Sequence, residues 1–370
     1  MMHDSLSRRT CGANSDRQFL IGRLAGMRGP LYRALPPFDR RDSLGGKAMR
    51  FKLTIVAAAL AMVIGPPSGH AQSAQRLNPM ITLHEQGMPV FGLYAPRART
   101  ARGRRGGGAT AGQPKSRAEL ASEILGYGSS DFVFDGSMER SVDDALSAFA
   151  GLVGAMQAAG ASTRSNPLVV KMQEIGTDYD AARAAIAKQL DAGVSTIMFV
   201  GVESAEEVRQ GLAAMRFASN GGTRPDAVGR APAYWGVSDA EYRRKADLWP
   251  LNPEGELLNW TIVESHEGLA HVREIAAVEG IGVLWPGAGT LRGLFSSTNA
   301  AGERTLDVEA WENSIQTVLA ACKEFDIPCG YPANASDIEM RMQQGFSVFV
   351  MGWGESGFAT VDLGRRVAGR

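Results

Sequence analysis

Charged and polar side chains that could do chemistry stand directly after several short apolar runs of this chain. Glu139 and Arg140 follow one run, and Lys171 ends the next. Glu264 ends a later run, and His266 stands two residues beyond it. Carboxylates bind hard divalent cations, a lysine or arginine binds a carboxylate, and a histidine transfers protons. These residue types favour a site for a metal ion or a small anionic substrate, although each one alone is also typical of a solvated surface.

A glycine-rich stretch, VLWPGAGTLRG at residues 283–293, contains a further apolar run. Its pattern is typical of a short buried strand that leads into a loop. We take Trp285, Gly287, Gly289 and Thr290 from this strand end and loop as candidate substrate-binding residues.

The elements that must position these residues alternate between short apolar runs and helix-length amphipathic segments. Continuous apolar strands separated by helices are typical of a parallel sheet covered by helices. Eight such units predict an α/β fold of the (β/α)8 TIM barrel type, with a doubly wound open sheet as the alternative; a barrel would bring the strand ends to one rim. No G-x-G-x-x-G motif follows the first strand, which weakens a dinucleotide-binding function. The predicted strands are 89–93, 131–135, 168–172, 195–200, 259–264, 281–285, 328–332 and 346–351, and the predicted helices include 142–159, 178–192, 204–217, 266–278 and 308–325.

Residues 49–71 have the layout of a secretory signal peptide. Met49 opens a short basic start, and residues 53–64 form an uncharged, mostly apolar run. That run is too short for a membrane-spanning helix, which needs about 20 residues; a buried core helix is the alternative. We therefore expect an exported protein, periplasmic or secreted, that is not membrane-embedded after cleavage. Residues 1–48 are then an upstream extension of the reading frame or a disordered basic leader.

The chain after the signal peptide is mildly acidic. It keeps 28 of the 39 Lys and Arg residues and 35 of the 39 Asp and Glu residues, a net charge near −7. A net negative charge argues against a nucleic-acid-binding protein, which would carry a basic surface. We expect residues 72–370 to form a single barrel domain with loop insertions at 95–117 and 219–258. The Arg- and Gly-rich first insertion is typical of a solvated loop, with an anion-attracting lid as the alternative; we expect the second to be ordered against the barrel mouth or a neighbouring subunit.

Cys322 and Cys329 are the cysteines of this part of the chain. Exported proteins can keep a disulfide, but we expect two buried free thiols. A metal site is not expected from a lone pair of cysteines without nearby histidines.

Five groups of residues then occur in a characteristic order. They are Asp131-Phe-Val-Phe with Met138-Glu139, Leu168-Val-Val-Lys171, Leu190-Asp-Ala-Gly193 with Ala205-Glu-Glu-Val208, Ile262-Val-Glu264 with Gly268-Leu269, and Ile275-Ala-Ala-Val278 with Gly280. In this order the chain resembles the HpcH/HpaI aldolase and citrate lyase-like family from about residue 83 to 358. The resemblance implies a TIM barrel that makes or breaks a carbon–carbon bond next to the carbonyl of a 2-oxo acid. It also implies a divalent metal, Mg²⁺ or Mn²⁺, that stabilises the enolate, and a homo-oligomer.

The match of site residues to the family is partial. Glu264 matches the first metal-binding carboxylate, whereas Thr290 stands where the second is expected, so we take Glu139 as the other candidate ligand, with Asp135 as the alternative. Arg140 stands where the family has a proton-transferring histidine, and His266 is a further candidate for a base.

Lys171 stands where the family has an arginine beside the oxo acid, and a lysine lacks the bidentate fork of an arginine. The candidate catalytic residues are therefore Lys171, Arg140 and His266.

Three functions stay open at this point. The first is a metal-assisted aldolase or carbon–carbon lyase acting on a 2-oxo acid. The second is a non-catalytic exported protein that binds a 2-oxo acid or another carboxylate on an aldolase scaffold. The third is a metal-free enzyme in which Lys171 forms a Schiff base with the oxo acid. The fold alone does not decide among them.

Overall fold

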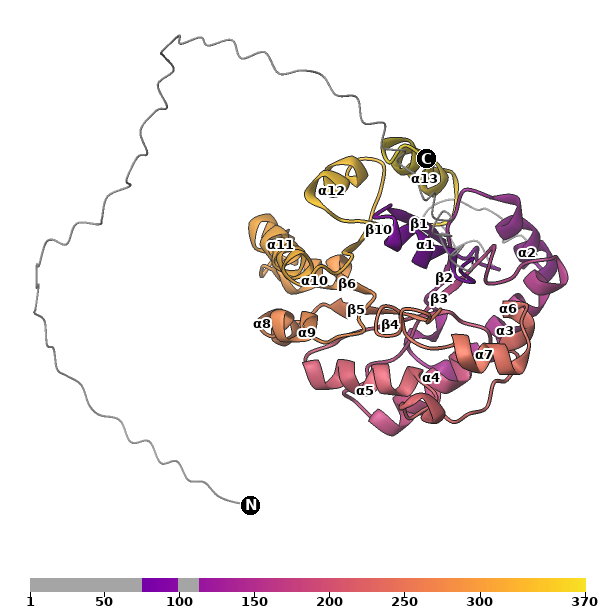
Figure 1. Ribbon diagram of the computed structural model, residues 1–370. Coiled ribbons are helices and arrows are strands. Elements are labelled where there is room, and N and C mark those ends of the chain that lie inside the picture. The colour runs from indigo at the N-terminus through magenta and orange to yellow at the C-terminus, as the bar shows by residue number, and fades with distance from the viewer. Residues whose placement is uncertain (1–74, 99–112) are drawn as a thin grey trace, which may run out of the picture. The chain divides into compact units, whose positions relative to one another are not determined.

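Eight parallel strands form the centre of this computed structural model, which describes residues 75–98 and 113–370 (Figure 1). They are β1 (Val90–Tyr94), β2 (Val133–Asp135), β3 (Leu168–Lys171), β4 (Thr196–Phe199), β5 (Leu258–Val263), β6 (Val283–Pro286), β9 (Gly330–Pro332) and β10 (Val348–Met351). The order in the sheet is β6-β5-β4-β3-β2-β1-β10-β9, and a parallel bridge between Leu284 and Cys329 joins the two edge strands. The predicted TIM barrel is thereby confirmed, and each predicted strand overlaps an observed one.

Helices cover the outside of the barrel (Figure 1). Four of the predicted helices begin at a polar residue, Ser141, Asp178, Ser204 or Asp307, whose side chain accepts a backbone N–H of the first turn. Such caps satisfy donors that have no partner inside the helix. The helices are α1 (Pro79–Glu85), α2 (Arg117–Gly126), α3 (Val142–Ala158), α4 (Tyr179–Asp191), α5 (Ala205–Met215), α6 (Ala231–Trp235), α7 (Asp239–Lys245), α8 (His266–Ala270), α9 (Val272–Ala276), α10 (Ala288–Leu294), α11 (Val308–Glu324), α12 (Ile338–Gln344) and α13 (Glu355–Val367), with short 3₁₀ turns η1 (Ser137–Glu139) and η2 (Ala218–Asn220).

The helix predicted at 266–278 is divided into α8 and α9. The division falls at His271, whose Nδ1 lies 3.0 Å from the carbonyl oxygen of Glu203. The His271 ring therefore contacts the backbone of the loop that precedes α5.

Two apolar layers hold the barrel together. The interior layer contains Trp260, which stacks on Trp285 with 5.5 Å between ring centroids and meets Phe132 edge-on. Met80 and Ile81 of α1 are fully buried in the same layer, so α1 closes the end of the barrel where the strands begin. The second layer lies between the strands and the surrounding helices. Full burial of each large apolar side chain contributes about 1.5–3 kcal/mol.

The insertion at 219–258 is ordered, as predicted, but it does not pack on the barrel mouth. Trp235 Nε1 donates to the carbonyl oxygen of Gly193, and the Tyr234 hydroxyl donates to that of Asn166. These two acceptors precede β4 and β3. The insertion therefore packs at the end where strands begin, opposite the rim that carries the candidate residues.

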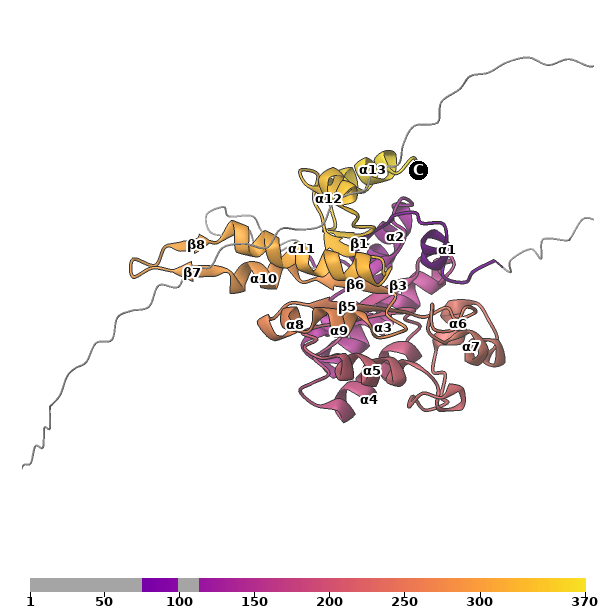
Figure 2. The ribbon, with the colours of Figure 1, turned by 60° about the vertical axis from the view of Figure 1, so that its left-hand side comes forward.

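A two-stranded hairpin, β7 (Ser296–Thr298) and β8 (Arg304–Leu306), was not predicted. It follows α10 and projects from the barrel (Figure 2).

The prediction of two free thiols was wrong. Cys322 and Cys329 form a disulfide between the end of α11 and the residue before β9. Both residues are buried. The cross-link thus lies beside the Leu284–Cys329 bridge at which the barrel closes.

The predicted signal peptide at 49–71 and the leader at 1–48 lie outside the described residues, as does most of the first insertion. Within the two described ranges, no helix combines the length and the apolar character needed to cross a bilayer.

Candidate active site

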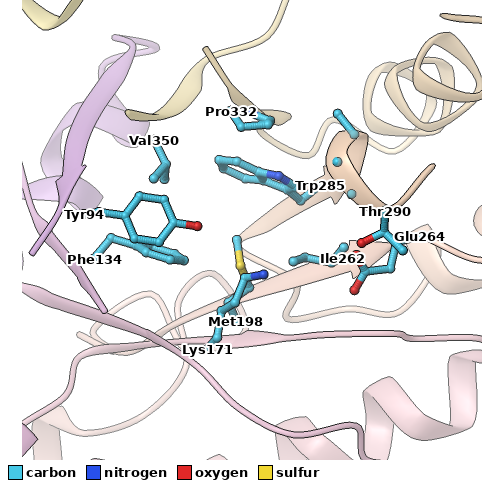
Figure 3. A pocket seen from close by; sticks show the side chains of 13 residues that line it. Tyr94, Phe134, Lys171, Met198, Ile262, Glu264, Trp285, Thr290, Pro332 and Val350 are labelled. Atoms are coloured by element: carbon cyan, nitrogen blue, oxygen red, sulfur yellow. The ribbon is translucent and has the colours of Figure 1, made fainter. Parts of the chain in front are cut away.

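A cavity of about 180 Å³ opens at the C-terminal ends of the strands, and we call it the inner cavity (Figure 3). Its walls are mostly apolar, with Phe134, Met198, Ile262, Trp285 and Val350 forming a box. Among the lining residues, those with ionisable side chains are Tyr94, Lys171 and Glu264. The full lining is Tyr94, Phe134, Lys171, Met198, Ile262, Glu264, Trp285, Gly287, Ala288, Gly289, Thr290, Pro332 and Val350.

Glu264 is the residue directly after β5, and its carboxylate lies close to the backbone of Gly201 and of Gly287. Its Oε1 accepts the N–H of Gly201 at 3.1 Å. A β-carbon at Gly287 would lie 2.5 Å from its Oε2, so a larger residue there would displace the carboxylate. Gly287 is thus required for the observed position of Glu264.

Lys171 at the end of β3 is paired with Glu139 of η1. The distance from Lys171 Nζ to Glu139 Oε1 is 3.0 Å, and the lysine side chain is largely buried. The pair fixes the ammonium at the cavity wall. It also occupies Glu139, one of the two residues predicted to bind metal.

Tyr94 lines the inner cavity but is not among the site residues predicted from the sequence. Its ring packs edge-on against Phe134, with 4.7 Å between centroids, and its hydroxyl points into the inner cavity (Figure 3). Burial raises the pKa of Tyr94, and Glu139 raises it further, while Lys171 and Arg97 act in the opposite direction. The first strand was predicted to end at Leu93, but β1 extends to Tyr94. A tyrosine at a strand end of a predicted barrel was the signal that could have identified it.

The four residues predicted to bind substrate all line the inner cavity. The Trp285 ring lies against the backbone of Gly330 in β9. A β-carbon at Gly330 would be only 1.7 Å from the Cε3 atom of Trp285, so the ring needs a glycine at this position. Gly287, Gly289 and Thr290 border the cavity at the start of α10. Their roles stay predictions, since position alone does not establish binding.

A larger, acidic groove adjoins the inner cavity and shares Glu264 and Thr290 with it. Its volume is about 960 Å³, and Arg140 is an exposed residue of its wall. We call it the acidic groove. Its lining is Glu139, Arg140, Gln173, Glu174, Gly176, Thr177, Asp178, Val200, Gly201, Glu203, Glu207, Glu264, Ser265, Thr290 and Leu294.

His266 lines neither of these spaces. It is the first residue of α8, is exposed, and packs edge-on against Phe295 at 5.5 Å. Its predicted role as a base therefore has no support from its position.

The donor atoms near Glu264 fit a divalent cation that is held partly by substrate. In the described ranges, Glu264 Oε2 and the Thr290 hydroxyl make no hydrogen bond, so both oxygens are available as hard donors. No group of three or more His, Cys, Asp or Glu side chains within those ranges is arranged to hold a metal ion. Mg²⁺ takes one or two protein carboxylates and completes its shell with water and substrate oxygens. The residues present fit that mode and not an all-protein cage.

Comparison with known proteins agrees with this geometry. The model of the HpcH/HpaI aldolase/citrate lyase family matches residues 113–352. A hydroxypyruvate/pyruvate aldolase of Delftia acidovorans (strain DSM 14801 / SPH-1) is 32% identical over 142 residues, which are 38% of this chain and 49% of that protein. The chain thus matches about half the length of this relative.

Two solved structures share the fold. An HpcH/HpaI aldolase/citrate lyase family protein from Burkholderia cenocepacia J2315 has a TM-score of 0.56 at 19% identity, covering 78% of this chain and 97% of that one. Macrophomate synthase has a TM-score of 0.53 at 17% identity, covering 79% of this chain and 90% of the other. The family match extends from just before α2 to the end of β10 and confirms the resemblance predicted from the sequence, so the chain belongs to the HpcH/HpaI aldolase/citrate lyase family.

Proposed function

We propose that this chain is a lyase of the aldolase type that cleaves or forms the carbon–carbon bond next to the carbonyl of a small 2-oxo acid. The observation that carries the proposal is the presence of Lys171 and Glu264 in the wall of one small, otherwise apolar cavity. A 2-oxo acid presents a carboxylate, which binds a cation, and a carbonyl oxygen, which needs an electrophile as the enolate forms. Family membership and the similarity to a hydroxypyruvate/pyruvate aldolase support this reaction class.

In this proposal Lys171 binds the carboxylate of the oxo acid. Glu139, 3.0 Å from Lys171 Nζ, keeps the ammonium from moving away when no substrate is bound. The apolar box excludes water from the reacting carbons, which strengthens the electrostatic interactions inside it.

A divalent metal, Mg²⁺ or Mn²⁺, when bound supplies the Lewis acid that stabilises charge on the enolate oxygen. Glu264 would hold it, with the Thr290 hydroxyl beside it and with water and substrate oxygens as the remaining ligands. Glu139 would join this set only by leaving Lys171.

Two other functions compete with this one. A Schiff-base mechanism needs Lys171 free to attack the carbonyl carbon, whereas its Nζ lies 3.0 Å from Glu139 Oε1 in an ion pair. A carboxylate-binding protein without turnover would use the same cavity and the same lysine. Turnover is therefore the measurement that separates it from an aldolase.

The test compares Glu264→Gln with the wild type, and Glu267→Gln, an exposed neighbour on α8, serves as the control. Removing the negative charge should abolish cleavage of a panel of 4-hydroxy-2-oxo acids and weaken binding of Mn²⁺ measured by electron paramagnetic resonance. The control should retain both. Full activity of Glu264→Gln would contradict the mechanism.

Two outcomes would favour the competing functions. Thermal stabilisation of the wild type by pyruvate, without turnover of any substrate in the panel, would favour the binding protein. Addition of mass to Lys171 after borohydride treatment with pyruvate would favour the Schiff base.

We also propose that the chain is exported through a signal peptide at 49–71 and assembles as a homo-oligomer. The layout of residues 49–71 supports export, and the family resemblance supports assembly. A mass spectrum of the protein recovered from its host tests the first, since retention of residues 49–71 would contradict cleavage. A monomeric mass in solution would contradict the second.

A further inference from the structure

Tyr94 occupies a boundary position at the rim of the barrel. It lines the inner cavity and also a second space of about 780 Å³, whose other lining residues include Arg97, Lys115 and Arg117. A molecule that extends out of the inner cavity on this side therefore passes the phenol.

The orientation of the Tyr94 ring is fixed by its neighbours. Tyr94 is paired with Phe134 in the register of β1 and β2, and the two rings meet edge-on. Gly136 lies against the same ring, because a β-carbon there would approach its Cε1 atom to 3.5 Å. The hydroxyl is consequently held toward the cavity (Figure 3).

The other two ionisable groups of the inner cavity already have partners. Lys171 is paired with Glu139, and Glu264 accepts the Gly201 amide. The Tyr94 hydroxyl makes no hydrogen bond to any residue of 75–98 or 113–370, and it is the remaining ionisable group among the residues that line the cavity. The phenol carries its proton at neutral pH, because an ordinary tyrosine has a pKa of 10.0 and the pKa of Tyr94 is raised from that value.

We propose that Tyr94 is a catalytic residue that donates its proton to the oxygen of the aldehyde when the carbon–carbon bond forms. This inference rests on the proposed aldolase function and names the residue that serves the second substrate. The enolate carbon of the oxo acid bonds to the aldehyde carbon, and the carbonyl electron pair becomes an alkoxide. That alkoxide takes the Tyr94 proton, and the tyrosinate regains one from water. The proton lost earlier from the methyl group of the oxo acid passes to solvent.

A role for Tyr94 as proton donor affects bond formation but not enolate formation, whereas a purely structural role would affect both steps. Formation of the enolate does not involve the aldehyde, so it does not need the Tyr94 proton. Bond formation does need it. A positioned general acid contributes roughly 10²- to 10⁴-fold to a rate.

The experiment compares Tyr94→Phe with Tyr179→Phe, a control tyrosine whose hydroxyl contacts Thr223 on the outside of the barrel. Exchange of the pyruvate methyl protons with deuterated water, followed by NMR in the presence of Mg²⁺, reports enolate formation. Condensation of pyruvate with a small aldehyde reports bond formation. Tyr94→Phe should exchange protons like the wild type but condense roughly 10²-fold or more slowly, whereas Tyr179→Phe should do both normally.

Three results would overturn the inference. Loss of exchange and condensation together, with an unchanged melting temperature, would make Tyr94 a binding or positioning residue. Normal rates of both reactions in Tyr94→Phe would exclude any catalytic part for the hydroxyl. Absence of both reactions in the wild type would instead refute the proposed function itself, and the inference with it.

Discussion

His84 makes the stability of the barrel depend on pH in a way that can be calculated. It lies in the last turn of α1, the helix that closes the barrel, and its ring stacks on Trp249 at 5.8 Å. Its Nε2 is buried and has no hydrogen-bond partner among the described residues. Burial lowers the pKa of His84 from 6.5 to about 4, because a charged imidazolium in this place would lose its hydration. The unfolded chain therefore binds a proton at a higher pH than the folded protein does.

The sign and size of the effect follow from linkage. A folded pKa below the unfolded one gives stability that is present above pH 6.5 and is lost as the pH falls toward 4. Between pH 7 and pH 5 the two pKa values correspond to a loss of about 2 kcal/mol in the free energy of unfolding. Other groups add their own dependence, so the contribution of His84 must be isolated by substitution.

The assay is urea unfolding of the wild type, His84→Phe and His84→Leu at pH 7 and at pH 5. Both substitutes are apolar and cannot titrate, but they differ in how they pack on Trp249. Each should lose about 2 kcal/mol less than the wild type between the two pH values. If both variants lose as much stability as the wild type, the argument from burial of His84 is wrong.

Two further predictions concern the site and the cross-link. Gly287→Ala should lower kcat/KM for cleavage of a 4-hydroxy-2-oxo acid by roughly 10²-fold, the cost typical of a catalytic group displaced by about 1 Å, because its β-carbon would lie 2.5 Å from Glu264 Oε2. Gly154→Ala, whose β-carbon would meet no neighbour within 4 Å, is the control, and equal activity of the two variants would refute the assignment. Replacing Cys322 and Cys329 together by serine should lower the free energy of unfolding by about 2 kcal/mol, from the loop that the disulfide closes. Dithiothreitol should then destabilise the wild type but not the double variant, and an equal effect on both would contradict the role of the bond.

The barrel strands could be predicted because each is an apolar run buried on both faces. Residues 348–351 show this most clearly, since every residue of β10 is apolar and buried. The hairpin at 296–306 has no such pattern, because its residues are polar and mostly exposed on both strands. The break at His271 was equally unpredictable. It involves a contact with the backbone of Glu203, 68 residues earlier in the chain.

The candidate site was predictable in its strand ends but not in its pairings. Lys171 and Glu264 were expected at one rim, and a barrel brings them there. The contact between Lys171 and Glu139 joins residues 32 positions apart and depends on how η1 turns after β2. The orientation of Tyr94 depends on the ring of Phe134 in the neighbouring strand. Such contacts come from tertiary packing, which the spacing of residues in a sequence does not encode.

Closure of the barrel by α1 has a kinetic consequence. With Met80 and Ile81 filling the interior at one end, the described residues leave the inner cavity open only toward the opposite rim. In the proposed reaction both reactants approach from this rim, and they cannot pass each other in a space of about 180 Å³. Under the proposed function, the oxo acid that binds within would then arrive before its aldehyde partner and, in cleavage, depart after it. A plug of apolar side chains at the far end of the barrel would thereby impose an ordered mechanism on the chemistry at the near end.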